Sequence, residues 1–178
     1  MTPHVRRRDA LAPRRLALGL VLALACAGTL LVHAPNARAT SGVTLDGYER
    51  SAMVRINSLR RSRGLPLVSS HVRLLAAADY HSREMAAYRY IGHASATGWA
   101  WSARVRTFLR ARRVGEVVGV LYRTYGIESR RVLAAWMRSP SHRRVLLTPA
   151  WRRIGVARRV RLGRTRLAFY TVDFSTYR

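Results

Sequence analysis

The 178-residue sequence predicts an α+β domain in which helices cover both faces of a small sheet. Three segments before residue 139 repeat apolar residues every three or four positions, which is typical of helices. After residue 153 the period changes to that of strands, and the last segment, 167–174, is apolar on both faces. A strand buried on both faces needs a layer of helices on each side.

Residues 1–39 predict an export signal that precedes the domain. Five arginines, at positions 6–8, 14 and 15, lead into the apolar run Leu16–Val32, and Ala37-Arg38-Ala39 places small residues where a signal peptidase cuts. We expect cleavage after Ala39, with residues 40–178 as a single domain. The apolar run is close to the length that spans a bilayer, so an uncleaved N-terminal anchor is the alternative. Both readings place the domain outside the cytoplasm.

The first predicted helix runs from Leu45 to Arg63, and Gly64 ends it. The second runs from about Ser70 to Tyr90, with Ser69 or Ser70 as its cap. Apolar residues in line mark one face of each: Leu45, Tyr48, Ala52, Ile56 and Leu59 in the first, and Leu74, Ala78, His81 and Met85 in the second. On this stripe, we expect His81 to be a hydrogen-bonded core residue rather than a ligand, and His71 to be exposed.

The third helix starts near Ser129 and must end by Ser139, because a residue before proline disfavours the helical conformation. Two strands follow, at 154–160 and 167–174, joined by a hairpin at 162–165. Residues 117–122 add a third strand. The only cysteine, Cys26, falls in the export signal, so the domain must be held by packing without disulfides.

The charge of the domain is strongly positive. The chain contains no lysine, and residues 40–178 hold 27 arginines against seven acidic residues. A field of this sign attracts polyanions, which outside a cell are anionic lipids, phosphate-bearing polymers or nucleic acid. Trp99 and Trp101 lie near Arg104 and Arg106, but no nucleic-acid-binding motif accompanies them, so nucleic acid is not the expected partner.

Three short segments carry ionisable residues at predicted helix ends or loops: Gly92-His93, Gly115-Glu116 and Ser141-His142. Two histidines and a carboxylate could form a three-ligand zinc site with an open position for water. They could equally form a hydrogen-bonded cluster without metal, in which Glu116 only binds backbone groups and fixes a loop. A carboxylate beside two imidazoles would favour their protonated forms, so the cluster could respond to mild acid.

The order of these and other segments resembles the CAP superfamily (cysteine-rich secretory, antigen 5 and pathogenesis-related proteins), in particular its short bacterial members without cysteines. The segments that carry the resemblance span about residues 48–175: 55–60, 63–67, 78–86, 92–95, Arg104, 115–116, 135–143, 154–156 and 170–174. The resemblance implies a three-layer α-β-α sandwich with a small, central, mostly antiparallel sheet. It also implies a cleft that holds two histidines and two glutamates.

His93, Glu116 and His142 match three members of that tetrad. Ser139 stands where other branches have the second glutamate, and Val117 replaces the usual asparagine after Glu116. Both departures make the cleft less polar. We expect Ser139 and Pro140 to end the helix so that His142 turns into the cleft opposite His93.

Arg143 and Arg144 are then expected at the rim of the cleft, unless they simply face solvent. His93 and His142 are the candidate ligands for a divalent metal such as zinc, although the resemblance requires no cofactor.

The resemblance implies a secreted or envelope-associated, monomeric protein that binds a lipid or an anionic envelope component without catalysis. The alternative is a hydrolase that uses zinc-activated water or a histidine as general base. Ser95 and Ser139 are close in sequence to the two histidines, but no Gly-x-Ser-x-Gly turn presents either as a nucleophile. A third interpretation is an interaction module that meets another envelope protein through its basic face.

Overall fold

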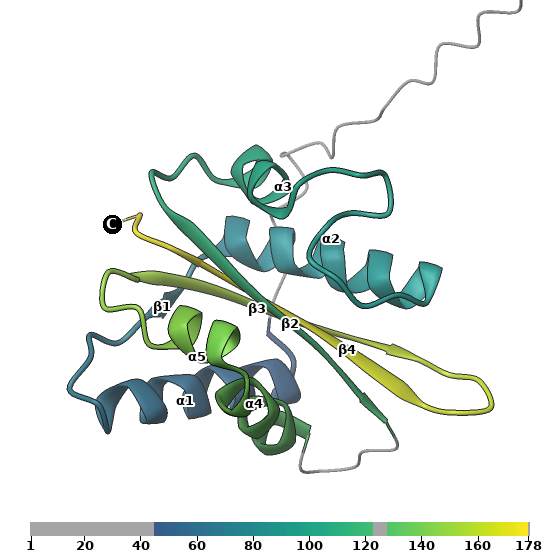
Figure 1. The fold of residues 1–178 in the computed structure, drawn as a ribbon, viewed down its shortest axis with the longest axis horizontal. Coiled ribbons are helices and arrows are strands. Elements are labelled where there is room, and N and C mark those ends of the chain that lie inside the picture. The colour runs from purple at the N-terminus through teal and green to yellow at the C-terminus, as the bar shows by residue number, and fades with distance from the viewer. Residues whose placement is uncertain (1–44, 123–127, 178) are drawn as a thin grey trace, which may run out of the picture. The chain divides into compact units, whose positions relative to one another are not determined.

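The computed structural model describes residues 45–122 and 128–177, so the predicted export signal, its cleavage site and Cys26 lie outside the described residues (Figure 1). The elements in chain order are α1 (Gly47–Arg61), β1 (Ser69–Ser70), α2 (Val72–Tyr88), α3 (Trp101–Phe108), β2 (Val114–Tyr122), α4 (Glu128–Arg138), α5 (Pro140–Leu146), β3 (Arg153–Arg161) and β4 (Leu167–Ser175). No helix among the described residues is long and apolar enough to cross a membrane.

The four strands form one sheet in the order β1-β3-β4-β2. β4 pairs antiparallel with β2 on one side and β3 on the other, and only the two-residue β1 pairs parallel, with β3. β2 is therefore an edge strand. Helices α1, α4 and α5 lie on one side of the sheet and α2 and α3 on the other (Figure 1). The predicted three-layer sandwich with a mostly antiparallel sheet is confirmed.

The face of the sheet toward α1, α4 and α5 carries the largest apolar core. Alternate residues of β4, from Ala168 to Phe174, pack there with side chains from β2, β3 and the helices. The tryptophans are anchored through their ring N–H: Trp136 donates to the carbonyl of Val118 and Trp151 to that of Val145, each at 2.7 Å. The ring N–H groups of both tryptophans therefore have hydrogen-bond partners.

The opposite face brings α2 unusually close to the sheet at Gly155. A Cβ on this residue would lie 2.1 Å from the backbone carbonyl carbon of Leu74. Backbone cannot move aside as a flexible side chain can, so only glycine fits here. This contact fixes the depth at which α2 lies on the sheet.

Several local expectations need correction. α2 is capped by His71, whose Nδ1 accepts the N–H of Arg73, and not by Ser69 or Ser70, which pair with β3 instead. His71 is half-buried, not exposed. α4 ends at Arg138 as expected, but Pro140 also begins a new helix, because a proline at the first helical position loses no hydrogen bond.

Candidate functional site

His93 lies on the loop that follows α2, and a buried polar network holds that loop. His81 is fully buried, and its two ring nitrogens lie 3.0 Å from Glu84 Oε2 and 2.8 Å from the carbonyl of Gly92. Glu84 also accepts the N–H of Ala96 and the hydroxyl of Tyr90. The prediction that His81 is a hydrogen-bonded core residue is confirmed.

Glu116 lies on the edge strand β2 and binds two side chains. Its Oε1 accepts a hydrogen bond from Nδ1 of His93 at 2.8 Å, and its Oε2 accepts one from Arg104. The Glu116 and Arg104 side chains are fully buried, whereas the His93 side chain is 43% exposed. Glu116 therefore orients the imidazole of His93 through a side-chain hydrogen bond. The alternative from the sequence, that Glu116 binds only backbone groups, is wrong.

Arg104 ties this carboxylate to α3 and to the His93 loop. Its guanidinium also donates to the carbonyl of His93 at 2.9 Å and approaches the Ser95 hydroxyl at 3.4 Å. A buried charge pair of this kind is tolerated only when such further bonds satisfy it. Arg104 is thus a positioning residue for both His93 and Glu116.

His142 comes from the other helical layer, in the first turn of α5. Its ring centroid lies 6.0 Å from that of His93, so the structure brings the two imidazoles together. Partial burial, and then the neighbouring His93, lower the pKa of His142 below its usual value. This contradicts the expectation that the carboxylate would favour protonation of both rings, since the bond of Glu116 goes to His93.

Asp173 is a second acidic residue beside Glu116. It is the cross-strand partner of Glu116, on the central strand β4, and it is fully buried. Apart from the neighbouring Glu116 carboxylate, neither of its carboxyl oxygens has a hydrogen-bond partner in the described part of the chain. Burial, and then the Glu116 carboxylate, raise the pKa of Asp173 well above its usual range. We call His93, Arg104, Glu116, His142 and Asp173 the Glu116 cluster.

The remaining predicted residues flank His142 in the sequence. Ser139 precedes α5, and its hydroxyl lies 3.0 Å from that of Ser141. Arg143 and Arg144 are exposed on α5, one and two residues beyond His142. Ser139 makes no contact with either histidine that would present it as a nucleophile.

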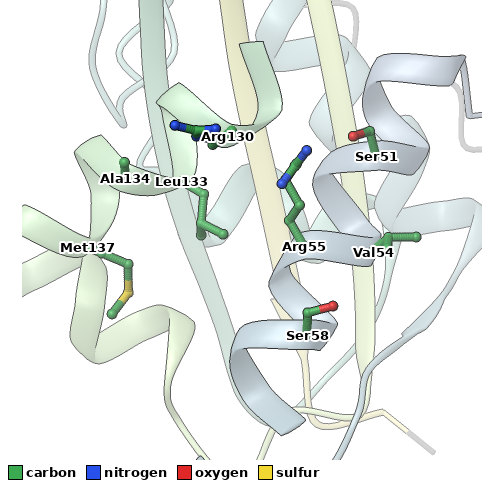
Figure 2. Close-up of a pocket in the computed structure, with 8 residues that line it drawn as sticks. All are labelled: Ser51, Val54, Arg55, Ser58, Arg130, Leu133, Ala134 and Met137. Carbon is green, nitrogen blue, oxygen red and sulfur yellow. The ribbon is translucent and has the colours of Figure 1, made fainter. Parts of the chain in front are cut away.

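A separate groove lies between α1 and α4. It has a volume of about 540 Å³ and is lined by Ser51, Val54, Arg55, Ser58, Arg130, Leu133, Ala134 and Met137. Figure 2 shows Leu133 and Met137 of α4 on the side toward α1, with Arg55 extending from α1 between the two helices. The groove thus combines apolar side chains with guanidinium groups. We call it the α1–α4 groove.

The sequence profile of the cysteine-rich secretory protein family, CAP, matches residues 53–174, which include every element from α2 to β3 and almost all of β4. The chain belongs to the CAP family. No curated protein matches the sequence of this CAP domain.

Solved structures resemble the fold. An outer surface protein of Borrelia burgdorferi is 22% identical, with a TM-score of 0.64 over 74% of this chain and 93% of that one. An extracellular protein of Bacillus anthracis that contains an SCP domain is 23% identical, with a TM-score of 0.60 over 74% of this chain. A cysteine-rich secretory protein of Staphylococcus aureus is 17% identical, with a TM-score of 0.54 over 73%. This CAP domain covers only 41% and 38% of the last two.

The donor set of the Glu116 cluster does not fit the three-ligand metal site considered from sequence. Both carboxylate oxygens of Glu116 are engaged, by His93 and Arg104. Within residues 45–122 and 128–177, no group of three or more histidine, cysteine or acidic side chains is arranged to hold an ion. What remains is a pair of imidazoles, with Glu116 orienting His93 as carboxylates orient metal-binding histidines.

Sequence reasoning missed Asp173 and the binding role of Arg104 in this CAP domain. A signal for Asp173 was present, because Thr171 and Asp173 are polar residues on one face of a strand that is apolar elsewhere. Arg104 could not be told apart from the other arginines by composition. The α1–α4 groove left no local sequence signal, because it depends on how two helices far apart in sequence pack.

Proposed function

We propose that this CAP domain is an exported, non-catalytic protein that binds an anionic lipid, with the acyl chain in the α1–α4 groove. The single observation that carries the proposal is the groove itself. Its volume of about 540 Å³ falls within the roughly 300–1,000 Å³ of small-molecule sites. Val54, Leu133, Ala134 and Met137 contribute aliphatic and thioether side chains to its lining, which favour an apolar ligand.

Two arginines of the groove favour a ligand with a negative charge. Arg55 donates through Nε to the Ser129 hydroxyl at 3.1 Å, which fixes the stem of the side chain. The terminal N–H groups of Arg55 and those of Arg130 can then bind a carboxylate or phosphate headgroup. Bound in this way, an acyl chain would contact Leu133 and Met137 while its headgroup meets the guanidinium groups.

The distribution of acids supports an anionic ligand. Six of the seven acidic residues among residues 45–122 and 128–177 are buried; only Asp46 is exposed, and it caps α1. The surface is therefore almost free of negative charge. A surface with so little compensation attracts anionic membranes and polymers over distances of about a Debye length, ~10 Å at moderate salt.

Export is the second part of the proposal. It is supported by the signal-like segment 1–39 and by the description of similar structures as an outer surface protein and an extracellular protein. Amino-terminal sequencing of the protein from culture medium and from membranes tests it. We expect a new terminus after Ala39; an intact terminus in the membrane fraction would instead indicate an anchor.

Hydrolysis is the alternative, and one contact favours it: Glu116 holds His93 as an acid holds a general base. The serine hydroxyls nearby are directed elsewhere, however, since Ser95 is near Arg104 and Ser139 is near Ser141. We therefore assign the Glu116 cluster a structural role. Hydrolysis of ester or peptide substrates that disappears in Glu116→Gln but survives in a folded groove variant would reverse this assignment.

A displacement assay with a fluorescent fatty acid tests lipid binding. Ala134 is exposed at the groove, so Ala134→Phe should fill it without opening the core, and we expect affinity to fall at least tenfold. The matched control is Ala87→Phe, the same change at an exposed position of α2. Equal affinity of the two variants would contradict the proposal.

The headgroup part is tested by Arg55→Gln against Arg131→Gln, an exposed arginine that does not line the groove. We expect Arg55→Gln to weaken a fatty acid severalfold but a fatty alcohol hardly at all. Equal losses of affinity for both ligands, or in both variants, would show that Arg55 does not bind the headgroup.

A further inference from the structure

A second cavity lies on the other side of the sheet, where α2 begins and α3 ends. It has a volume of about 460 Å³ and is lined by His71, Val72, Arg73, Arg106, Thr107, Phe108, Leu109, Arg110 and Tyr177. Three of these residues are arginines and none is acidic. They come from the start of α2 with its cap, from the end of α3 and the residues after it, and from the chain after β4, so the fold brings them together. We call this cavity the arginine pocket.

The arginines of this pocket are less engaged than arginines elsewhere in the fold. Within the described ranges, the Arg73 and Arg110 side chains make no hydrogen bond or ion pair, and Arg106 reaches only the Ser102 carbonyl, at 3.5 Å. By contrast, Arg60 is fully buried and donates to three backbone carbonyls, those of Pro66, Leu146 and Thr148. The N–H groups of the pocket are therefore available to a ligand.

His71 forms part of the pocket wall and lies close to positive charge. Burial, and then Arg153 and Arg73, lower the pKa of His71. Its Nδ1 accepts the backbone N–H of Arg73 at 3.2 Å, which leaves Nε2 as the protonated nitrogen and a donor. The imidazole also packs edge-on against Tyr177, with ring centroids 5.3 Å apart. Figure 1 shows the C-terminal end of the chain beside the beginning of α2.

We propose that the arginine pocket binds a phosphate group. Phosphate offers several oxygens that can each accept from a different guanidinium, whereas a carboxylate is saturated by one or two. Phe108, Leu109 and Val72 line the remainder of the cavity, whose volume exceeds that of a single phosphate, so the organic part of a phosphate ester fits beside them. This site is on the α2–α3 side of the sheet and is independent of the α1–α4 groove.

The test is an NMR titration of the folded domain with glycerol 1-phosphate at low salt. The pocket variant combines Arg73→Gln, Arg106→Gln and Arg110→Gln, all at exposed positions. The charge-matched control combines Arg61→Gln, Arg63→Gln and Arg131→Gln, which are also exposed but outside the pocket. We expect saturable binding with the largest shifts around His71 and Leu109, weakened at least tenfold in the pocket variant and less than twofold in the control.

Equal weakening in both triple variants would reduce the effect to bulk charge and overturn the proposal, as would the absence of saturable binding by the parent protein. Vesicles of phosphatidylglycerol and of phosphatidylcholine distinguish the source of the phosphate. Dependence of vesicle binding on the three arginines indicates a lipid headgroup, and binding of glycerol phosphate alone indicates a soluble ester or polymer. Fatty-acid displacement should be unchanged in the pocket variant, so this proposal and the proposed function fail separately.

Discussion

Two fully buried glutamates, one on each side of the sheet, are held in different ways. Glu128, at the start of α4, binds Arg166 at 2.6 Å, Arg158 at 3.3 Å and the Tyr170 hydroxyl at 3.1 Å. Glu116 binds Arg104 and the imidazole of His93, which reaches solvent, and it opposes a second acid, Asp173. The partners of Glu128 are mostly buried, whereas Glu116 has one partner, His93, whose side chain is exposed to solvent.

The difference shows where the fold tolerates a change of charge. Glu128 is paired with the guanidinium groups of Arg158 and Arg166, so its negative charge is required. The Glu116 cluster has two acids beside one buried arginine, and the raised pKa of Asp173 indicates that this second acid does not ionise readily. The Glu116 cluster therefore has a spare acid, Asp173, directly across the strand pair from Glu116.

The largest expected effect is that of Glu128→Gln. Loss of the carboxylate removes a counter-charge from the buried Arg158 and the half-buried Arg166, which costs about 3–5 kcal/mol in such networks. Chemical denaturation at pH 7 measures the change. A loss smaller than that of Glu116→Gln would break the comparison.

Glu116→Gln should cost less, about 1–2 kcal/mol, on the scale of a lost buried hydrogen bond. Asp173 can then ionise beside Arg104 and restore the charge pair. Combining Glu116→Gln with Asp173→Asn removes both acids, so the double variant should lose at least ~1 kcal/mol more than the sum of the single variants. Additive losses would show that Asp173 does not replace Glu116.

The fold could be predicted where the apolar pattern is long and regular. Helices near α1, α2 and α4 and strands near β2, β3 and β4 were all expected, because each has either a regular apolar period or a continuous apolar run. α3 was missed because it spans only eight residues, without a side-chain cap, and α5 was missed because Pro140 was read only as the end of a helix. Ser69–Ser70 pair as β1 through backbone contacts that no side-chain pattern reveals.

The site was only partly predictable from the sequence. His93, Glu116 and His142 were identified by resemblance, and the structure places the three together. The hydrogen bond from Arg104 to Glu116 depends on how α3 packs, and the lowered pKa of His142 depends on how α5 packs. Neither can be seen in the sequence. The two cavities arise between elements distant in sequence, so they could be found only in the folded chain.

The pH profile of Asp173→Asn tests the spare acid. A raised pKa means that folded Asp173 keeps a proton that the unfolded chain releases, so folding stability falls as pH rises from about 3.9 toward the higher folded pKa. Asparagine cannot titrate, so we expect the variant to gain stability relative to the parent protein as pH rises through this window. Parallel pH profiles from urea unfolding would show that Asp173 ionises as freely as an exposed aspartate.

The smallest expected effect is that of His142→Gln on the acid side. The lowered pKa means that the unfolded chain takes up a proton before the folded one does, so stability falls as pH drops below about 6.5 through the folded pKa. Glutamine should flatten this decline between pH 7 and 5, modestly because the ring is only half-buried. A steeper decline in the variant would indicate that His142 is stabilised in its charged form.

Photo-crosslinking with a diazirine fatty acid, followed by mass spectrometry of chymotryptic peptides, tests most directly whether the groove or the Glu116 cluster holds the ligand. We expect adducts on residues 51–58 of α1 and 130–137 of α4, competed by unlabelled fatty acid and lost in Ala134→Phe. Competed adducts on His93 and on residues 140–144, with none in the α1–α4 groove, would contradict this proposal and would place the binding site at the two histidines.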